Sequence, residues 1–218
     1  MIGRRWLAAA TAVILGGAGV LALSNQSHDV PDKRAPEDRP ALALLTSLPL
    51  VFGESFSLDN GGSAALSRLE QRYTVQPVGV ADAASLKGQE LLLMAHPRAQ
   101  PAEALVELDQ WVRRGGHVLL LADPRLDWPS ERPLGDLLRP PPMFADTGLL
   151  SHWGLTLSEA GLASSGACAI ADQGLIARCR IGQGSATVIA DADFIDVKEP
   201  GAAGLDLLMS ELDRLETR

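Results

Sequence analysis

Three aspartates and one histidine follow apolar runs that resemble buried strands. Asp123, Asp191 and Asp193 each come after such a run, and His96 ends another. In an open α/β sheet the carboxyl ends of parallel strands meet at one edge, and ligands bind there. Carboxylates gathered at that edge could bind a hard cation such as Ca²⁺ or Mg²⁺. The interpretation that we favour is that these aspartates cap turns and helix N-termini, and that a single histidine before proline is structural.

The chain has two cysteines, Cys168 and Cys179. If Gln173-Gly174 forms the tip of a hairpin, these two residues lie directly opposite each other, and an oxidising compartment would allow a cross-strand disulfide. The alternative is a pair of reduced thiols packed on the sheet. Metal binding by the cysteines is disfavoured, since no histidine or third cysteine stands nearby in the sequence, and we expect no bound metal or cofactor.

The stretch Gln100–Pro124 contains the clearest local structure. Leu105, Leu108 and Val112 recur at helical spacing, and Gly115-Gly116 is typical of a helix end because glycine enters the left-handed region without a Cβ penalty. The continuous apolar run that follows is typical of a strand covered on both faces. This stretch predicts α/β layering.

The remaining pattern predicts a mostly parallel sheet with flanking helices of about a dozen residues, a C-terminal β-hairpin and a closing helix. Strands are expected at 41–48, 74–80, 90–95, 118–122 and 184–190, another starting at Leu157, a hairpin at 167–171 and 175–181, and helices at 63–73, 146–153 and 201–215. A Pro-rich insert, Arg125–Pro142, should lie over one end of the sheet. The apolar residues of this region either cover the sheet edge or form a docking patch; they are Leu126, Trp128, Leu134, Leu137, Leu138, Met143 and Phe144.

Composition excludes some classes of partner. Hydrophobic residues make up 46% and charged residues 21% of the 218 residues, which is ordinary for a globular fold. The formal net charge of −8 and the absence of a basic block argue against nucleic acid as a partner. An aromatic content of 4% disfavours stacking platforms for bases or sugars.

The N-terminal part predicts export from the cytoplasm. Arg4-Arg5 precedes the uncharged, largely apolar run Trp6–Leu23. That length suits either a single membrane span or the core of a cleaved signal peptide, and we favour the span. The arginines favour a cytoplasmic N-terminus, so we expect a single-pass protein of the bacterial inner membrane with a periplasmic domain. The expected parts are an anchor at 1–24, a flexible charged stalk at 25–40 and an α/β domain at 41–218.

Several blocks occur in an order that resembles a known family. They are LLLMAHP, ALVELDQWVRRGGHVLLLADP, LLSHWGLTL, IGQGSATVIADADFID and GLDLLMSELDRL. Together they span 42–215 and are similar to the periplasmic domain of GldG-like auxiliary proteins of ABC-type transport systems. The resemblance implies a class I glutamine amidotransferase-like fold with flavodoxin-like layering. It also implies a membrane-tethered accessory domain that acts with ABC permease and ATPase subunits.

Enzymes with an amidotransferase-like fold place a nucleophilic Cys on a sharp turn after a central strand, with a His to activate it. The corresponding turns here are Ala95-His96-Pro97 and Ala122-Asp123-Pro124, which contain neither Cys nor Ser. We therefore predict a non-enzymatic binding domain with no catalytic residue. The alternative is a hydrolase-like domain that binds a small ligand or a cation through Asp123, Asp191 and Asp193, with His96 at the same edge.

Overall fold

A computed structural model of the chain describes residues 33–53 and 62–217. The predicted anchor and the first half of the predicted stalk, residues 25–32, therefore lie outside the described residues. Within the described ranges, no helix is long and apolar enough to cross a membrane.

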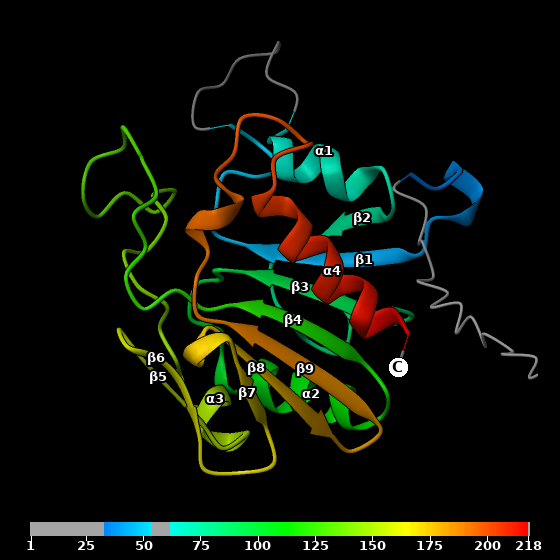
Figure 1. Cartoon of the computed structure of the whole chain (residues 1–218), viewed down its shortest axis with the longest axis vertical. Helices are drawn as coiled ribbons and strands as arrows, with labels where there is room; N and C mark the ends of the chain where they lie inside the picture. The colour runs from blue at the N-terminus through cyan, green and yellow to red at the C-terminus, as the bar shows by residue number, and fades with distance from the viewer. Residues whose placement is uncertain (1–32, 54–61, 218) are drawn as a thin grey trace, which may run out of the picture. The chain divides into compact units, whose positions relative to one another are not determined.

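A seven-stranded sheet forms the centre of the domain (Figure 1). Its spatial order is β2-β1-β3-β4-β9-β8-β7. The first five of these strands run parallel, and β8 and β7 are antiparallel to their neighbours, which confirms the predicted mostly parallel sheet. The bounds are β1 Ala41–Thr46, β2 Thr74–Pro77, β3 Leu91–Ala95, β4 His117–Leu121, β7 Ala169–Ala171, β8 Ile176–Ile181 and β9 Gly184–Ile189.

The central strands are apolar throughout because both of their faces are covered. All five residues of β3 are buried, as are all six of β9 and the last four of β4. Met94 pairs with Leu120, and Leu120 pairs with Val188, so apolar residues lie in a row across the sheet. Burial on both faces is the reason that these strands show no alternation of polar and apolar residues.

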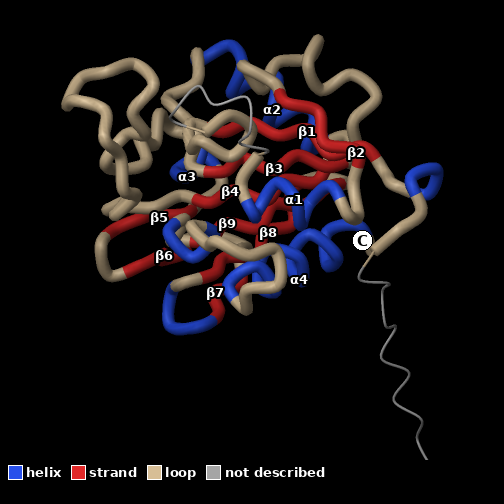
Figure 2. Tube along the Cα trace, turned by 90° about the horizontal axis from the view of Figure 1, so that it is seen from above, coloured by secondary structure: helices blue, strands red, loops and turns tan. Residues whose placement is uncertain are grey.

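Helices cover both faces of the sheet (Figures 1 and 2). The helices α1 (Ala64–Glu70) and α4 (Gly204–Glu216) pack on one face, where their apolar residues join Leu42, Leu44 and Leu93. The opposite face packs against α2 (Ala102–Arg113), α3 (Leu149–His152) and a separate antiparallel pair, β5 (Leu155–Ser158) with β6 (Gly161–Ser164). Gly115 follows α2 with φ of 116°, as the predicted glycine helix end requires.

Some predicted elements were wrong in detail. The helix α1 has seven residues instead of about a dozen, and β2 ends at Pro77 instead of residue 80. The strand expected from Leu157 begins at Leu155 and belongs to the β5–β6 pair, which we did not predict. The hairpin has a loop of residues 172–175 instead of a two-residue tip, although Ala171 still faces Ile176 in the expected register.

The chain joins the domain before residue 41. Arg34 donates two hydrogen bonds to the Glu216 carboxylate at 2.9 and 2.6 Å, and its backbone N–H donates to Gln71 O. A 3₁₀ turn, η1, follows at Pro36–Asp38. Residues 34–40, which we had expected in the flexible stalk, are therefore held against α4 and the end of α1.

Candidate functional site

The topology brings the three predicted aspartates together at the carboxyl edge of the sheet. Asp123 follows β4, and Asp191 and Asp193 follow the neighbouring strand β9. One carboxylate oxygen from each lies within 4.8 Å of the others. Arg125 and Glu159 line the same open cavity of about 360 Å³. Oxygen ligands at this spacing are of the kind that Ca²⁺ and Mg²⁺ prefer.

Each of these carboxylates already has a backbone partner. Asp123 accepts hydrogen bonds from the N–H groups of Arg125 and Ala192 at 2.8 and 2.9 Å. Asp191 accepts from the N–H of Asp193 at 2.8 Å, and Asp193 accepts from the N–H of Asp127 at 3.0 and 3.1 Å. These bonds fix the turns after β4 and β9, so the arrangement favours the capping interpretation over a dedicated ligand site.

The proximity of the acids has an electrostatic cost. Burial raises the pKa of Asp193 above its ordinary value, and the negative charges of Asp123, Asp191 and Asp127 raise it further, against the lowering effect of the hydrogen bond from Asp127 N–H. A bound cation would offset this repulsion. Protonation of Asp193 would offset it as well, without any ligand.

His96 lies at the end of β3, but its contacts are those of a structural residue. The side chain is fully buried, and Nε2 lies 3.0 Å from the carbonyl oxygen of Pro141 in the insert. Its backbone N–H donates to Leu121 O, and its carbonyl accepts from the Ser47 hydroxyl. Burial lowers the pKa of His96, opposed by the Pro141 carbonyl and the Asp123 charge, so the neutral ring is favoured. With φ of 44°, the residue also turns the chain sharply away from the sheet.

The structure joins Cys168 and Cys179 in a disulfide. Cys179 lies on β8 and is buried, while Cys168 directly precedes β7. The bond ties the edge of the sheet together at the position where the hairpin register places the two cysteines opposite each other.

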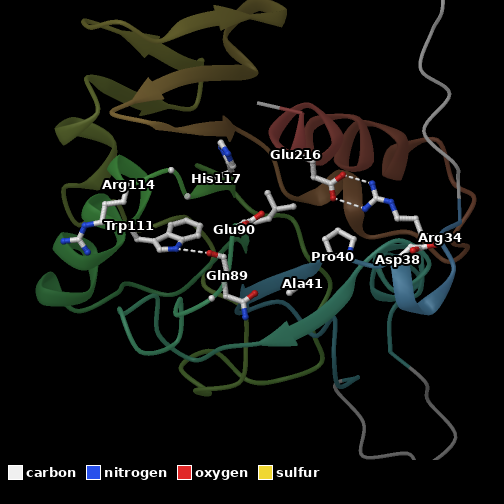
Figure 3. Close-up of a pocket in the computed structure, with 14 residues that line it drawn as sticks. Arg34, Asp38, Pro40, Ala41, Gln89, Glu90, Trp111, Arg114, His117 and Glu216 are labelled. Atoms are coloured by element: carbon white, nitrogen blue, oxygen red, sulfur yellow. Dashed lines mark hydrogen bonds and ion pairs between the residues drawn. The ribbon is translucent and has the colours of Figure 1, made fainter.

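A larger cavity lies at the other end of the parallel strands (Figure 3). It has a volume of about 810 Å³ and lies at the amino ends of β1, β3 and β4. Several polar groups around it are already paired, since Arg34 binds Glu216 and the Trp111 indole N–H donates to Gln89 O at 3.2 Å. The cavity thus marks the junction of the incoming chain with the α2–β4 turn and the end of α4.

Sequence reasoning missed a set of acidic residues on α4 and their arginine partners. The Glu211 side chain is 2% exposed and receives two hydrogen bonds from Arg178 of β8. Asp213 accepts from Arg72 at 2.8 Å. Arg72 and Arg34 lie 6.0 and 5.4 Å from the ring centre of Tyr73. A signal was present in the sequence, because Glu211 interrupts the apolar stripe of α4.

A family model described as "ABC-type uncharacterized transport system", an ABC transport auxiliary family, matches residues 39–171. The matched range covers more than half of the chain and runs from the entry of the domain to the end of β7. The chain belongs to this family. The family supports an accessory role in transport, and the glutamine amidotransferase-like fold and the GldG-like assignment remain predictions.

Two solved structures resemble this chain, and at their low sequence identity the resemblance concerns the fold alone. The N-terminal domain of mmIFT52 has 13% identity and a TM-score of 0.56, and the match covers 82% of this chain and 98% of that one. The exo-β-1,4-mannosidase Op5Man5 from Opitutaceae bacterium strain TAV5 has 12% identity and a TM-score of 0.42. That match covers 82% of this chain but 34% of the enzyme, so the chain spans about a third of the mannosidase. No curated protein sequence matches the chain.

Proposed function

We propose that this chain is a non-enzymatic accessory domain of an ABC-type transport system, tethered to the bacterial inner membrane by residues 6–23 with its α/β domain in the periplasm. The observation that carries the proposal is the family match over 39–171. In this role the domain binds permease or ATPase-associated subunits of the transporter and does not itself carry out a reaction.

The ends of the central strands support a binding role. The turn after β3 contains His96-Pro97 and the turn after β4 contains Asp123-Pro124, neither of which offers a Cys or Ser nucleophile. Their side chains instead bind backbone groups of neighbouring turns, His96 at Pro141 and Asp123 at Ala192. The residues at this edge are therefore used to hold loops in place.

The disulfide and the N-terminal sequence support the proposed location. A disulfide between Cys168 and Cys179 is expected to persist outside the reducing cytoplasm. The Arg4-Arg5 pair before the apolar run 6–23 favours translocation of the following chain. An alkaline phosphatase fusion at the C-terminus should be active in the periplasm, whereas a cytoplasmic domain would leave the fusion inactive.

Purification of the complete chain tests the proposed partners. A tagged full-length chain, cross-linked in native membranes and solubilised in mild detergent, should recover an ABC permease or ATPase subunit that mass spectrometry identifies. The control is a tagged fusion of the same N-terminal segment to an unrelated periplasmic domain. Recovery of no transport subunit above that control would refute the proposal.

A further inference from the structure

The segment that leads into β1 lies against the domain although it adds almost nothing to the core. We refer to residues 33–40 as the strap. None of its residues is buried, and only Arg34 and Arg39 are half-buried. The strap has two prolines and no large apolar side chain. Burial of apolar surface therefore cannot offset the entropy lost on ordering this segment, so its polar contacts must do so.

Arg34 supplies most of these contacts. Its guanidinium donates to both oxygens of the Glu216 carboxylate at 2.9 and 2.6 Å, and the two side chains are only 15 and 19% exposed. The guanidinium also lies 5.4 Å from the ring centre of Tyr73, and the backbone N–H donates to Gln71 O. Arg39 donates to the Arg34 carbonyl at 3.2 Å. A bidentate arginine–carboxylate pair with little access to water is a strong polar contact, so one residue fixes the strap to α4.

The strap limits how far the domain can lie from a membrane. In the proposed function the membrane span ends at Leu23, so the nine residues 24–32 join it to the strap. Fully extended, nine residues cover about 30 Å. If the strap were released, the seventeen residues 24–40 would join the span to β1, and these cover about 60 Å when extended. The contacts of Arg34 therefore roughly halve the greatest possible separation.

The strap is attached at the amino end of the parallel strands. Glu216 is the last residue of α4, and the strap leads directly into β1. Arg34 and Glu216 both line the cavity of about 810 Å³ at this end, and Trp111 and His117 line it from α2 and β4 (Figure 3). A short tether therefore keeps this end of the domain, with its cavity, closer to the membrane than the carboxyl end that carries the insert 125–142.

We propose that the strap holds the amino end of the sheet towards the membrane, so that the cavity at this end is the part of the domain nearest to the lipid headgroups. This inference rests on the membrane tether of the proposed function and deepens it by assigning the membrane-facing surface. The pair of Arg34 and Glu216 is the contact that keeps the domain in this orientation. Breaking the pair frees the strap, and the domain then moves further from the membrane and rotates.

Energy transfer to a labelled lipid tests the orientation. The complete chain is reconstituted in phosphatidylcholine vesicles that contain an acceptor-labelled lipid, and a donor-labelled unnatural amino acid is placed at position 87 or at position 134. Lys87 lies beside the cavity and Leu134 lies in the insert, and both are exposed. The two positions lie at opposite ends of strands about 20 Å long, so transfer should be roughly twofold or more higher from position 87. Equal transfer from the two positions, or higher transfer from position 134, would overturn the proposal.

Charge variants of the full chain test the role of the ion pair. R34E places a second negative charge beside Glu216, so the ratio of transfer from positions 87 and 134 should fall towards one. The exchange R34E/E216R restores a pair of opposite charges and should restore the ratio. K33E makes the same charge change at the exposed neighbouring residue and should keep the wild-type ratio. An unchanged ratio in R34E, or no recovery in R34E/E216R, would overturn the role of this pair.

Two controls separate this inference from the proposed function. Far-ultraviolet circular dichroism should show every variant folded, because the strap contributes no buried residue, and the comparison of the two label positions in the wild type needs no variant. The vesicles contain no transport subunit, so a failure of the proposed partner binding leaves the result unaffected. Absence of the wild-type chain from the membrane fraction would instead refute the tether in the proposed function.

Discussion

Removal of Arg178 should destabilise the domain more than removal of its partner Glu211. The Glu211 side chain is 2% exposed, while that of Arg178 is 20% exposed. An R178M variant leaves a buried carboxylate with one remaining cation, Arg214, at 3.5 Å and 51% exposed. Loss of one partner from a buried pair costs about 3–5 kcal/mol. We expect about 3 kcal/mol here, since Arg214 and the partial exposure of Arg178 reduce the loss.

Removing the charge of Glu211 should destabilise the domain less than removing Arg178. In E211Q the arginine keeps a hydrogen-bond acceptor and reaches solvent through its exposed side, so the expected loss is about 1–2 kcal/mol. Replacing both residues by methionine removes the buried charge together with its partner, which is often close to neutral. The double variant R178M/E211M should therefore be more stable than R178M alone.

Thermal unfolding of the full-length chain in mild detergent, followed by far-ultraviolet circular dichroism, measures these differences. A loss of about 3 kcal/mol corresponds to a fall in Tm of roughly 6–12 °C for a domain of this size. The matched control is R180M, an exposed arginine two residues further along the same strand, which should change stability by less than about 0.5 kcal/mol. A free energy of unfolding for R178M equal to that of R180M, or a double variant R178M/E211M no more stable than R178M, would refute this expectation.

Three further predictions concern other contacts. Replacing both Cys168 and Cys179 by serine should lower the free energy of unfolding by about 3 kcal/mol, because the disulfide closes a loop of about a dozen residues. Urea unfolding measures this loss, and a reductant should lower the stability of the wild type and not that of the variant. D123N should lower the Tm, because it removes a charged acceptor from the buried Ala192 N–H. Under the capping interpretation, millimolar Ca²⁺ or Mg²⁺ should leave the wild-type Tm unchanged. A rise in Tm with the cation that D191N/D193N abolishes would instead indicate a cation site. The pKa of Asp109 lies below the ordinary 3.8, because hydrogen bonds from Arg113 and Trp153 outweigh the raising effect of burial. The stabilisation by the Asp109 carboxylate is therefore present above that pH and is lost as the pH falls through the folded-state pKa. The Tm difference between wild type and D109N should shrink below about pH 4, and a constant difference would contradict this assignment.

The parts of the fold that could be predicted are those whose burial dictates residue type. The central strands β1, β3, β4 and β9 are apolar runs because both faces of the sheet are covered, and their predicted bounds differ from the observed ones by two residues or fewer. The long helices α2 and α4 could be predicted because one face of each is apolar at helical spacing.

The β5–β6 pair could not be predicted, because its strands have four residues each and only Leu155 and Leu162 are buried. Two buried side chains do not make a periodic pattern. The conformation of the insert could not be predicted for another reason: Arg98 and His96 bind backbone carbonyls that lie more than thirty-five residues away in sequence, and such bonds leave no spacing rule.

The convergence of Asp123 with Asp191 and Asp193 could be predicted, since it follows from two parallel strands that end at one edge. The roles of these residues could not be, because they depend on which backbone N–H groups the turns present. For Glu211 the burial could be predicted and the partner could not. Its position in an apolar stripe indicated a buried charge, but the identity of its partner, Arg178, follows from the side of β8 that faces α4.

The same edge that would hold a reaction centre in an enzyme of this architecture holds a loop here. His96 at the end of β3 binds Pro141, Asp123 at the end of β4 accepts from Arg125 N–H, and the Asp123 carbonyl accepts from Phe144 N–H at 2.7 Å. These three contacts fix both ends of the insert 125–142. Loss of the His96 ring should therefore loosen the insert, so that H96A raises the rate of hydrogen exchange at the backbone amides of 125–142. Unchanged exchange in the insert of H96A would contradict this role of His96.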